Sequence, residues 1–278
     1  MRLPFPLVLL VALATTGTAS AEPEAASSTT AAKPAAEPWC PDELETLPGD
    51  VCYAATPARP AGAKSGTPRT LVIFLHGLVK AGAGWQHNQM IGMARGGKRL
   101  GFSVLAPRGQ PGGSLRHGAD MVAWPTGRAA QKAHELRLLA TWTRARELVE
   151  QRQAAPFDEV FVVGFSNGAY YASSLALRGK VAVDGYALFA GGAPRQAKAK
   201  AAERRPIFLG VCGKDDTAKR ALELGRALKK LGWPHRQETR RVGHLIADRH
   251  LDNALTYLRG ERARARPAKG SAGAPPLP

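Results

Sequence analysis

The chain has 278 residues, and 44% of them are hydrophobic, a fraction that is ordinary for a globular protein. Its formal net charge is +17 at pH 7. We find no arginine-rich recognition helix and no basic stretch interleaved with aromatic residues, so the charge does not indicate nucleic-acid binding. Two explanations of the charge stay open. One is a solvated surface rich in arginine, and the other is adhesion to an anionic surface or an acidic substrate.

Residues 1–21 have the pattern of a secretory signal peptide. Arg2 precedes an apolar run from Leu3 to Ala14, and the small residues Ala19-Ser20-Ala21 follow. A charged start, a short apolar core and an A-x-A site are typical of cleavable signals, and the run is short for a membrane-spanning helix. We therefore predict cleavage before Glu22 and a secreted or periplasmic protein. An uncleaved membrane anchor is the alternative.

Export affects how the three cysteines are interpreted. Cys40 and Cys52 lie twelve positions apart, and in an oxidising compartment we expect them to pair. Two reduced cysteines are the alternative. Closing so short a loop would contribute about 3 kcal/mol on the chain-entropy model. Cys212 ends an apolar run, which predicts a buried free thiol.

Composition divides the chain into four parts. Residues 1–21 are the predicted signal peptide, and residues 22–38, rich in Ala, Pro, Ser, Thr and Glu, predict a flexible linker. Residues 39–260 form the predicted folded domain, which begins with a small hairpin or cap held by the cysteines. Residues 261–278 are rich in Arg, Ala, Pro and Gly and predict a disordered basic tail.

Short apolar runs alternate with helical patterns along the folded part. The runs cover residues 71–75, 102–106, 160–163, 186–190 and 207–211. Helical spacing of apolar residues marks 134–152 and 218–231, with one more possible strand at 236–242 and a closing helix at 245–258. This alternation predicts an α/β fold with a doubly wound, mostly parallel sheet and helices on both faces. Ligands bind such sheets at the carboxyl ends of the strands.

Residues 164–168 read Gly-Phe-Ser-Asn-Gly and directly follow the third apolar run. The sequence G-x-S-x-G between a strand and a helix is the nucleophile elbow, a sharp turn that presents a serine hydroxyl at the end of the sheet. Glycine is needed beside the serine because larger residues would collide with neighbouring backbone. The pattern predicts that Ser166 is a nucleophile, and a purely structural turn is the alternative.

A serine nucleophile needs a general base and an acid that orients the base. With this elbow, the acid and then the histidine follow the serine in chain order. His244 follows the last predicted strand and is the expected base, with His250 as a weaker rival. Asp215 and Asp216 follow the fifth run. We favour Asp216 as the acid, because Asp215 can instead cap the next helix.

Acyl transfer also needs donors for the oxyanion. The backbone N–H of Asn167, directly after the nucleophile, is one expected donor. Gly77 permits a sharp turn after the first run, and the N–H of Leu78 is the second expected donor. We expect His76, in the same loop, to bond loop backbone rather than to act as a base.

Large side chains between the early strands are candidates for a substrate pocket, with ordinary core packing as the alternative. They are Trp85, Met90, Met93, Met121 and Trp124. From this set we take Trp85 and Trp124 as the substrate-binding candidates. Three basic residues could contact an acidic substrate group, namely Lys80, Arg108 and Arg116.

Together these motifs resemble the α/β-hydrolase superfamily, and within it the phospholipase/carboxylesterase group that includes the acyl-protein thioesterases. The matching segments are 74–78, 84–85, 106–107, 123–125, 164–168, 213–216 and 243–244. The resemblance implies the α/β-hydrolase fold, with Ser166, His244 and Asp216 as the triad and Leu78 and Asn167 at the oxyanion. The group usually carries glutamine where Asn167 stands. Asparagine there is also found in secreted hydrolases similar to polyester depolymerases and feruloyl esterases.

These features predict a secreted serine esterase that cleaves a small-molecule or lipid-like ester through an acyl-enzyme. The mechanism requires no metal and no organic cofactor, and we expect a monomer or a weak dimer. An amidase, peptidase or polyester depolymerase on the same triad is one alternative. A non-catalytic protein that binds anionic envelope components is the other.

Overall fold

The structure is a computed structural model that describes residues 38–56, 67–80, 82, 84–112, 118, 120–194 and 203–265. The predicted signal peptide, nearly all of the predicted linker and the end of the predicted tail lie outside these residues. Arg116 also lies outside them.

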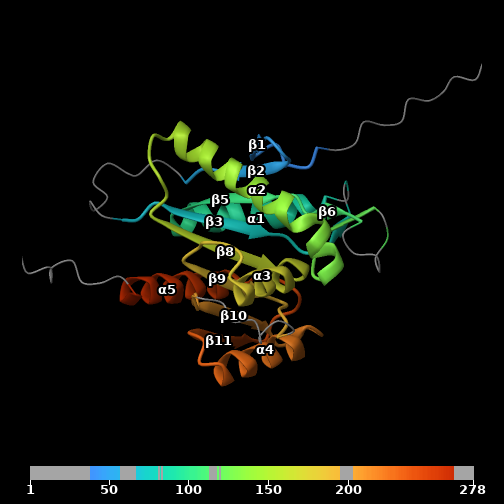
Figure 1. The fold of residues 1–278 in the computed structure, drawn as a ribbon, viewed down its shortest axis with the longest axis vertical. Coiled ribbons are helices and arrows are strands. Elements are labelled where there is room, and N and C mark those ends of the chain that lie inside the picture. The colour runs from blue at the N-terminus through green and yellow to red at the C-terminus, as the bar shows by residue number, and fades with distance from the viewer. Residues whose placement is uncertain are drawn as a thin grey trace, which may run out of the picture. The chain divides into compact units, whose positions relative to one another are not determined.

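An eight-stranded sheet forms the centre of the described domain, in the order β1-β2-β5-β3-β8-β9-β10-β11 (Figure 1). Its strands are β1 (Glu45–Leu47), β2 (Val51–Ala54), β3 (Thr70–Leu75), β5 (Phe102–Pro107), β8 (Glu159–Phe165), β9 (Gly185–Phe189), β10 (Ile207–Cys212) and β11 (His235–Arg240). From β5 to β11 in this order all neighbours are parallel, whereas β2 pairs antiparallel with both β1 and β5. The prediction of a mostly parallel, doubly wound sheet is confirmed.

Helices cover both faces of this sheet. They are α1 (Trp85–Leu100), α2 (Arg128–Arg152), α3 (Asn167–Arg178), α4 (Ala218–Lys230) and α5 (Asp248–Ala265). Alternate side chains of a strand point to opposite faces. Thus Leu71 and Ile73 of β3 pack in the cluster that contains α2, α3 and α4. Val72 and Phe74 pack in the cluster that contains α1 and α5.

The cysteine-linked N-terminal segment is part of the main sheet rather than a separate cap. Strands β1 and β2 form a hairpin, and β2 extends the parallel strands as an antiparallel edge. Cys40 and Cys52 are joined by a disulfide, as predicted. Cys212 is a buried free thiol, also as predicted.

Two features differ from the sequence predictions. A second, three-stranded sheet in the order β4-β7-β6 consists of β4 (Val79–Lys80), β6 (Gln110–Pro111) and β7 (Met121–Ala123). Helix α5 continues to Ala265, so the start of the predicted disordered tail is wrong. Its last turns are anchored, because the Arg262 Nε lies 3.0 Å from the Asp184 Oδ1. Within the described residues, no helix has the length and apolarity needed to cross a membrane.

Candidate active site

Ser166 stands alone between the end of β8 and the start of α3, in the tight turn that the sequence predicts. Its backbone has φ 50° and ψ −116°, in a region that residues other than glycine rarely adopt. The end of the neighbouring strand β9 holds the turn in place, because the Ser166 N–H donates to the Phe189 carbonyl at 2.9 Å. A strained, well-anchored backbone of this kind is found at functional sites.

The two glycines of the elbow are required by close backbone contacts. A Cβ on Gly164 would lie 2.6 Å from the carbonyl oxygen of Gly168, and a Cβ on Gly168 would lie 2.0 Å from that of Leu75. Both distances are shorter than any van der Waals contact. The predicted steric reason for these glycines is therefore confirmed. Because Gly168 has no side chain, the start of α3 can lie directly against the end of β3.

His244 and Asp215 form a hydrogen-bonded pair at the ends of the neighbouring strands β11 and β10. The distance from the His244 Nδ1 to the Asp215 Oδ2 is 2.6 Å. The Asp215 side chain is 7% exposed and that of His244 is 43% exposed. The carboxylate can thus hold the imidazole in one orientation, with Nδ1–H donating and Nε2 available as a base.

Asp215 is also bonded by the residue that begins the next turn. The N–H and the hydroxyl of Thr217 donate to its two carboxylate oxygens at 3.1 and 2.8 Å. Burial acts to raise the pKa of Asp215, but the hydrogen bonds from Thr217 and His244 outweigh it and lower the pKa below its usual value. The Asp215 carboxylate is therefore ionised in the folded protein at neutral pH.

The prediction of Asp216 as the triad acid is wrong. Asp216 is exposed, and the partner of His244 is Asp215. The preference rested on the idea that Asp215 caps the next helix. The N-cap of α4 is instead Thr217, and the Asp215 carboxylate accepts from Thr217 and contacts His244.

His244 packs next to the elbow that carries Ser166. The ring centroids of Phe165 and His244 are 4.9 Å apart, so the imidazole packs on the residue that directly precedes Ser166. Among the described residues the Ser166 hydroxyl makes no hydrogen bond, to His244 or to any other group. Catalytic hydrogen bonds are often long without substrate and shorten when it binds. His250 is not a rival base, because it is fully buried beside Phe189.

The loop after β3 lies against the elbow, as the oxyanion prediction requires. A Cβ on Gly77 would be 3.3 Å from the Ser166 Cβ. Among the described residues, the backbone N–H groups of Leu78 and Asn167 make no hydrogen bonds. Both expected donors are therefore available, one in the loop and one at the N-terminus of α3, where the helix dipole favours negative charge.

His76 stabilises this loop and is not a base. Its Nδ1 donates to the Gly77 carbonyl at 2.5 Å, and its Nε2 accepts from the Gly109 N–H at 3.1 Å. Burial lowers the pKa of His76 to about 4, and the hydrogen bond to Gly77 opposes this only in part. The ring is therefore neutral at pH 7 with both nitrogens occupied, in agreement with the sequence prediction.

Trp124 supports the site from within the core and does not line it, which corrects the prediction of a substrate contact. It is 0% exposed and stacks on Tyr171. Its backbone N–H donates to the Asn167 Oδ1 at 2.7 Å, and its indole N–H donates to the His76 carbonyl at 2.8 Å. The tryptophan thereby ties the elbow to the oxyanion loop, and asparagine after the serine has a defined structural role.

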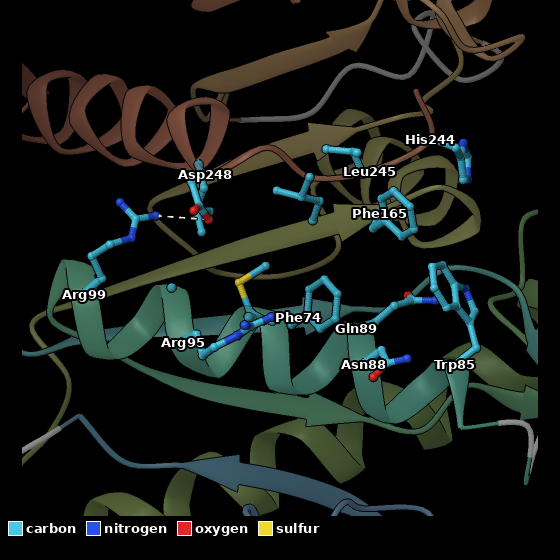
Figure 2. Close-up of a pocket in the computed structure, with 15 residues that line it drawn as sticks. Phe74, Trp85, Asn88, Gln89, Arg95, Arg99, Phe165, His244, Leu245 and Asp248 are labelled. Carbon is cyan, nitrogen blue, oxygen red and sulfur yellow. Dashed lines mark ion pairs between the residues drawn. The ribbon is translucent and has the colours of Figure 1, made fainter. Parts of the chain in front are cut away.

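A pocket of about 420 Å³ opens beside His244, between α1 and the segment that leads into α5 (Figure 2). Its apolar lining comes from Phe74, Met93, Phe165, Leu245, Ile246 and Leu251. Its polar lining comes from Asn88, Gln89, Arg95, Arg99, His244 and Asp248. Trp85 stands at the same end as His244 and is 51% exposed, so its predicted place at the pocket is consistent with the structure.

The other candidates from the sequence do not all reach this pocket. Met93 lines it, whereas Met90 is buried in the core and Met121 belongs to β7. Lys80 pairs with Asp120 at 3.1 Å, and Arg108 pairs with Asp50 at 2.8 Å. The two basic residues are thus already occupied by acidic neighbours.

Sequence analysis missed Gln89 and Arg95, which line the pocket from α1. Gln89 accepts a hydrogen bond from the Gly77 N–H at 2.7 Å, so it contacts the oxyanion loop directly. Gln89 is one turn before Met93 and lies on the same face of α1, whereas Arg95, two residues after Met93, lines the pocket from another side of the helix. Residues 85–100 have no strong apolar stripe, so the sequence did not predict this helix.

Comparisons with known proteins agree with this geometry. The phospholipase/carboxylesterase family model matches residues 62–260. A comparison with curated protein sequences gives no significant match.

Three solved structures illustrate the shared fold. Arabidopsis thaliana SOBER1 is 20% identical, with 70% of this chain and 99% of that chain covered and a TM-score of 0.51. A carboxylesterase from Mesorhizobium loti is 18% identical, with 79% and 100% covered and a TM-score of 0.52. The Bacillus cereus carboxylesterase is 16% identical, with 76% and 93% covered and a TM-score of 0.52.

The family match spans more than half of the chain and includes the elbow, the paired aspartate and histidine, and the loop after β3. The sheet order and the solved structures agree with the α/β-hydrolase fold that the motifs resemble. The chain therefore belongs to the phospholipase/carboxylesterase family of α/β hydrolases, and it is an esterase.

Proposed function

We propose that the protein is a secreted serine hydrolase that cleaves carboxylic esters with Ser166 as nucleophile, His244 as base and Asp215 as the orienting acid. The observation that carries this proposal is the 2.6 Å contact between the His244 Nδ1 and the Asp215 Oδ2, beside a serine held at φ 50°. A nucleophile, a base and a group that orients the base are the minimum for acyl transfer.

In the first half of the reaction, the Ser166 Oγ attacks the ester carbonyl while the His244 Nε2 takes the hydroxyl proton. The negative charge that forms on the carbonyl oxygen is received by the N–H groups of Leu78 and Asn167. His244 then gives its proton to the leaving alcohol oxygen as the ester C–O bond breaks. The products of this half are a free alcohol and an ester of the acyl group with Ser166.

In the second half, water takes the place of the alcohol. His244 removes a proton from the water as the water oxygen attacks the acyl carbon. The same proton returns to the Ser166 Oγ as the acyl bond breaks. A free acid leaves, Ser166 and His244 recover their first protonation states, and no cofactor takes part in the cycle.

Hydrolysis of p-nitrophenyl esters with acyl chains of two to sixteen carbons tests this proposal, with Ser166→Ala as the paired variant. We expect turnover by the parent and a loss of at least about a thousandfold in the variant. Amide, feruloyl and polyester substrates then rank the alternative leaving groups. If neither protein hydrolyses any of these while both stay folded, the hydrolase proposal is wrong.

The same comparison distinguishes the non-catalytic alternative. A protein that only binds anionic envelope material would show retention on anionic surfaces that weakens steeply with salt. That retention would be equal in the parent and in Ser166→Ala. Turnover that depends on Ser166 would favour the hydrolase instead.

Export is supported by the signal-like pattern of residues 1–21 and by the disulfide between Cys40 and Cys52, since such bonds persist in oxidising compartments. Expression of the full chain in a bacterium with an active export pathway tests it. N-terminal sequencing of the product should begin at Glu22. A product that keeps Met1 and stays inside the cell would contradict export.

A further inference from the structure

The pocket beside His244 changes in character along its length (Figure 2). Trp85, Gln89 and His244 stand at one end, and Arg95 and Arg99 stand at the other. Apolar side chains lie between, among them Phe74 and Met93. A ligand that fills this pocket would therefore meet polar groups at both ends and an apolar surface between them.

Gln89 gives the first indication of what the near end binds. Its Oε1 accepts from the Gly77 N–H, which identifies the other amide atom as the donor Nε2. The Nε2 is buried and has no hydrogen-bond partner among the described residues. Buried donors in folded proteins are nearly always paired, so this one would gain an acceptor from a ligand if the Gln89 amide turned further into the pocket that it lines. An oxygen of the substrate ester would serve.

Arg95 gives the second indication, at the far end. Arg99 is already committed, because it forms ion pairs with Asp248, at 3.6 Å, and with Asp252. Arg95 has neither an ion pair nor a hydrogen bond among the described residues. It is therefore the cation at this end that a ligand can use.

The separation of Gln89 and Arg95 along α1 indicates the length of the ligand. Gln89 and Arg95 are six residues apart on α1, and at 1.5 Å per residue their backbones are about 9 Å apart along the helix axis. An extended chain of six to eight carbons is of this order. The leaving alcohol takes its proton from the half-exposed His244 and can depart to solvent. The acyl group must stay until water attacks, and the pocket is suited to hold it.

We propose that the pocket binds an apolar acyl chain that ends in an anionic group, so that the preferred substrates are half-esters of medium-chain dicarboxylic acids. The ester oxygen would lie near Gln89, the methylene chain over Phe74 and Met93, and the terminal carboxylate at Arg95. This inference rests on the proposed function and specifies its substrate class.

Paired substrates of equal length test the inference. They are the mono-p-nitrophenyl esters of adipic and suberic acid, and p-nitrophenyl hexanoate and octanoate. We expect kcat/KM to favour the carboxylate-ended ester of each pair at low salt and the ratio to fall as salt is added. Arg95→Gln should lower the ratio about fivefold, mainly through KM, as expected for one exposed charge pair. Lys98→Gln, an exposed cation on the same helix outside the pocket, should leave the ratio unchanged.

Direct binding separates this inference from the proposed function. Calorimetric titration of Ser166→Ala with suberate and with octanoate measures preference without turnover. The inference is supported if Ser166→Ala binds suberate more tightly than octanoate and if Ser166→Ala/Arg95→Gln loses this preference. This result would hold even if every ester tested is a poor substrate. Equal binding of the two acids, or a ratio of kcat/KM that Arg95→Gln and Lys98→Gln change alike, would overturn it. Turnover of neutral esters in that case would leave the proposed function intact.

Discussion

At the amino ends of β3 and β8, Glu159 is 2% exposed, and one oxygen of its carboxylate accepts two hydrogen bonds. The Thr70 hydroxyl donates to it at 2.5 Å, and the Arg259 Nε donates to the same oxygen at 2.7 Å. A second nitrogen of Arg259 donates to the Thr70 hydroxyl at 2.7 Å, which closes the network. At the carboxyl ends of the same two strands, Ser166 adopts a strained backbone, and the N–H of Leu78 has no hydrogen-bond partner among the described residues.

The amino ends of these strands stabilise the fold, whereas the carboxyl ends carry features that cost stability. A buried carboxylate costs free energy unless it is paired and bonded, and at the amino ends it is both. At the carboxyl ends, unpaired donors and an unfavourable φ angle remain in the folded state. Substitutions at the two ends should therefore separate activity from stability.

The largest effect expected from the carboxyl ends is on turnover. Asp215→Asn should lower kcat by about a thousandfold to ten-thousandfold, because the amide cannot hold the imidazole in the required tautomer. Asp216→Asn, one residue along and exposed, is the matched control and should change kcat less than threefold, roughly, as exposed substitutions away from a site do. Steady-state kinetics on a p-nitrophenyl ester measures both. A large loss in Asp216→Asn with none in Asp215→Asn would reverse the assignment.

The next effect is on stability and comes from the amino ends. Glu159→Ala leaves the Arg259 guanidinium without its buried partner, and we expect it to lower the free energy of unfolding by about 4 kcal/mol. Urea denaturation measures the change. Glu223→Gln breaks an exposed pair with Arg220, 3.1 Å apart, and should cost less than about 0.5 kcal/mol. Activity per folded molecule should stay constant in both variants, and a loss of it in Glu159→Ala would mean that the two ends are coupled.

A smaller effect is expected on the dependence of stability on pH. Folding lowers the pKa of His76 from 6.5 to about 4, so the unfolded chain takes up this proton first as the pH falls. Neutral His76 therefore contributes about 3 kcal/mol to the free energy of unfolding above pH 6.5. This contribution is lost as the pH falls from 6.5 to 4. Burial lowers the pKa of His250 as well, which adds to the same slope. Urea denaturation of the parent and of His76→Gln at several pH values isolates the His76 share. An equal slope in both would contradict it.

The sequence was sufficient to predict β3, β5, β8, β9 and β10, because these buried parallel strands are continuous apolar runs. The edge strand β11 is polar and was predicted only as a possible strand. The sequence was not sufficient for β4, β6 and β7, whose two or three residues are too short to show a period. The elbow was predicted because its glycines and serine are local. The helix end at Ala265 was missed because its anchor, Asp184, is distant in sequence.

The site was predicted less completely, for physical reasons that differ by residue. Asp215 and Asp216 are neighbours, and the path of the turn after β10 decides which one faces His244. Trp124 has the size and apolarity of a pocket residue, but its packing on Tyr171 depends on α3, which the sequence around it does not indicate. Gln89 and Arg95 join the site only through tertiary structure, because Gln89 contacts Gly77 and Arg95 lines a pocket that the start of α5 also lines.

Covalent labelling of Ser166 tests the central proposal most directly. A fluorophosphonate is attacked only by an activated serine, so intact-mass spectrometry of the reacted protein should show one adduct per chain. Peptide mapping should locate that adduct on Ser166, and Ser166→Ala should stay unlabelled. Asp215→Asn should react far more slowly than Asp216→Asn. A parent protein that remains unlabelled while folded, or an adduct on another residue, would contradict the assignment of Ser166 as the nucleophile.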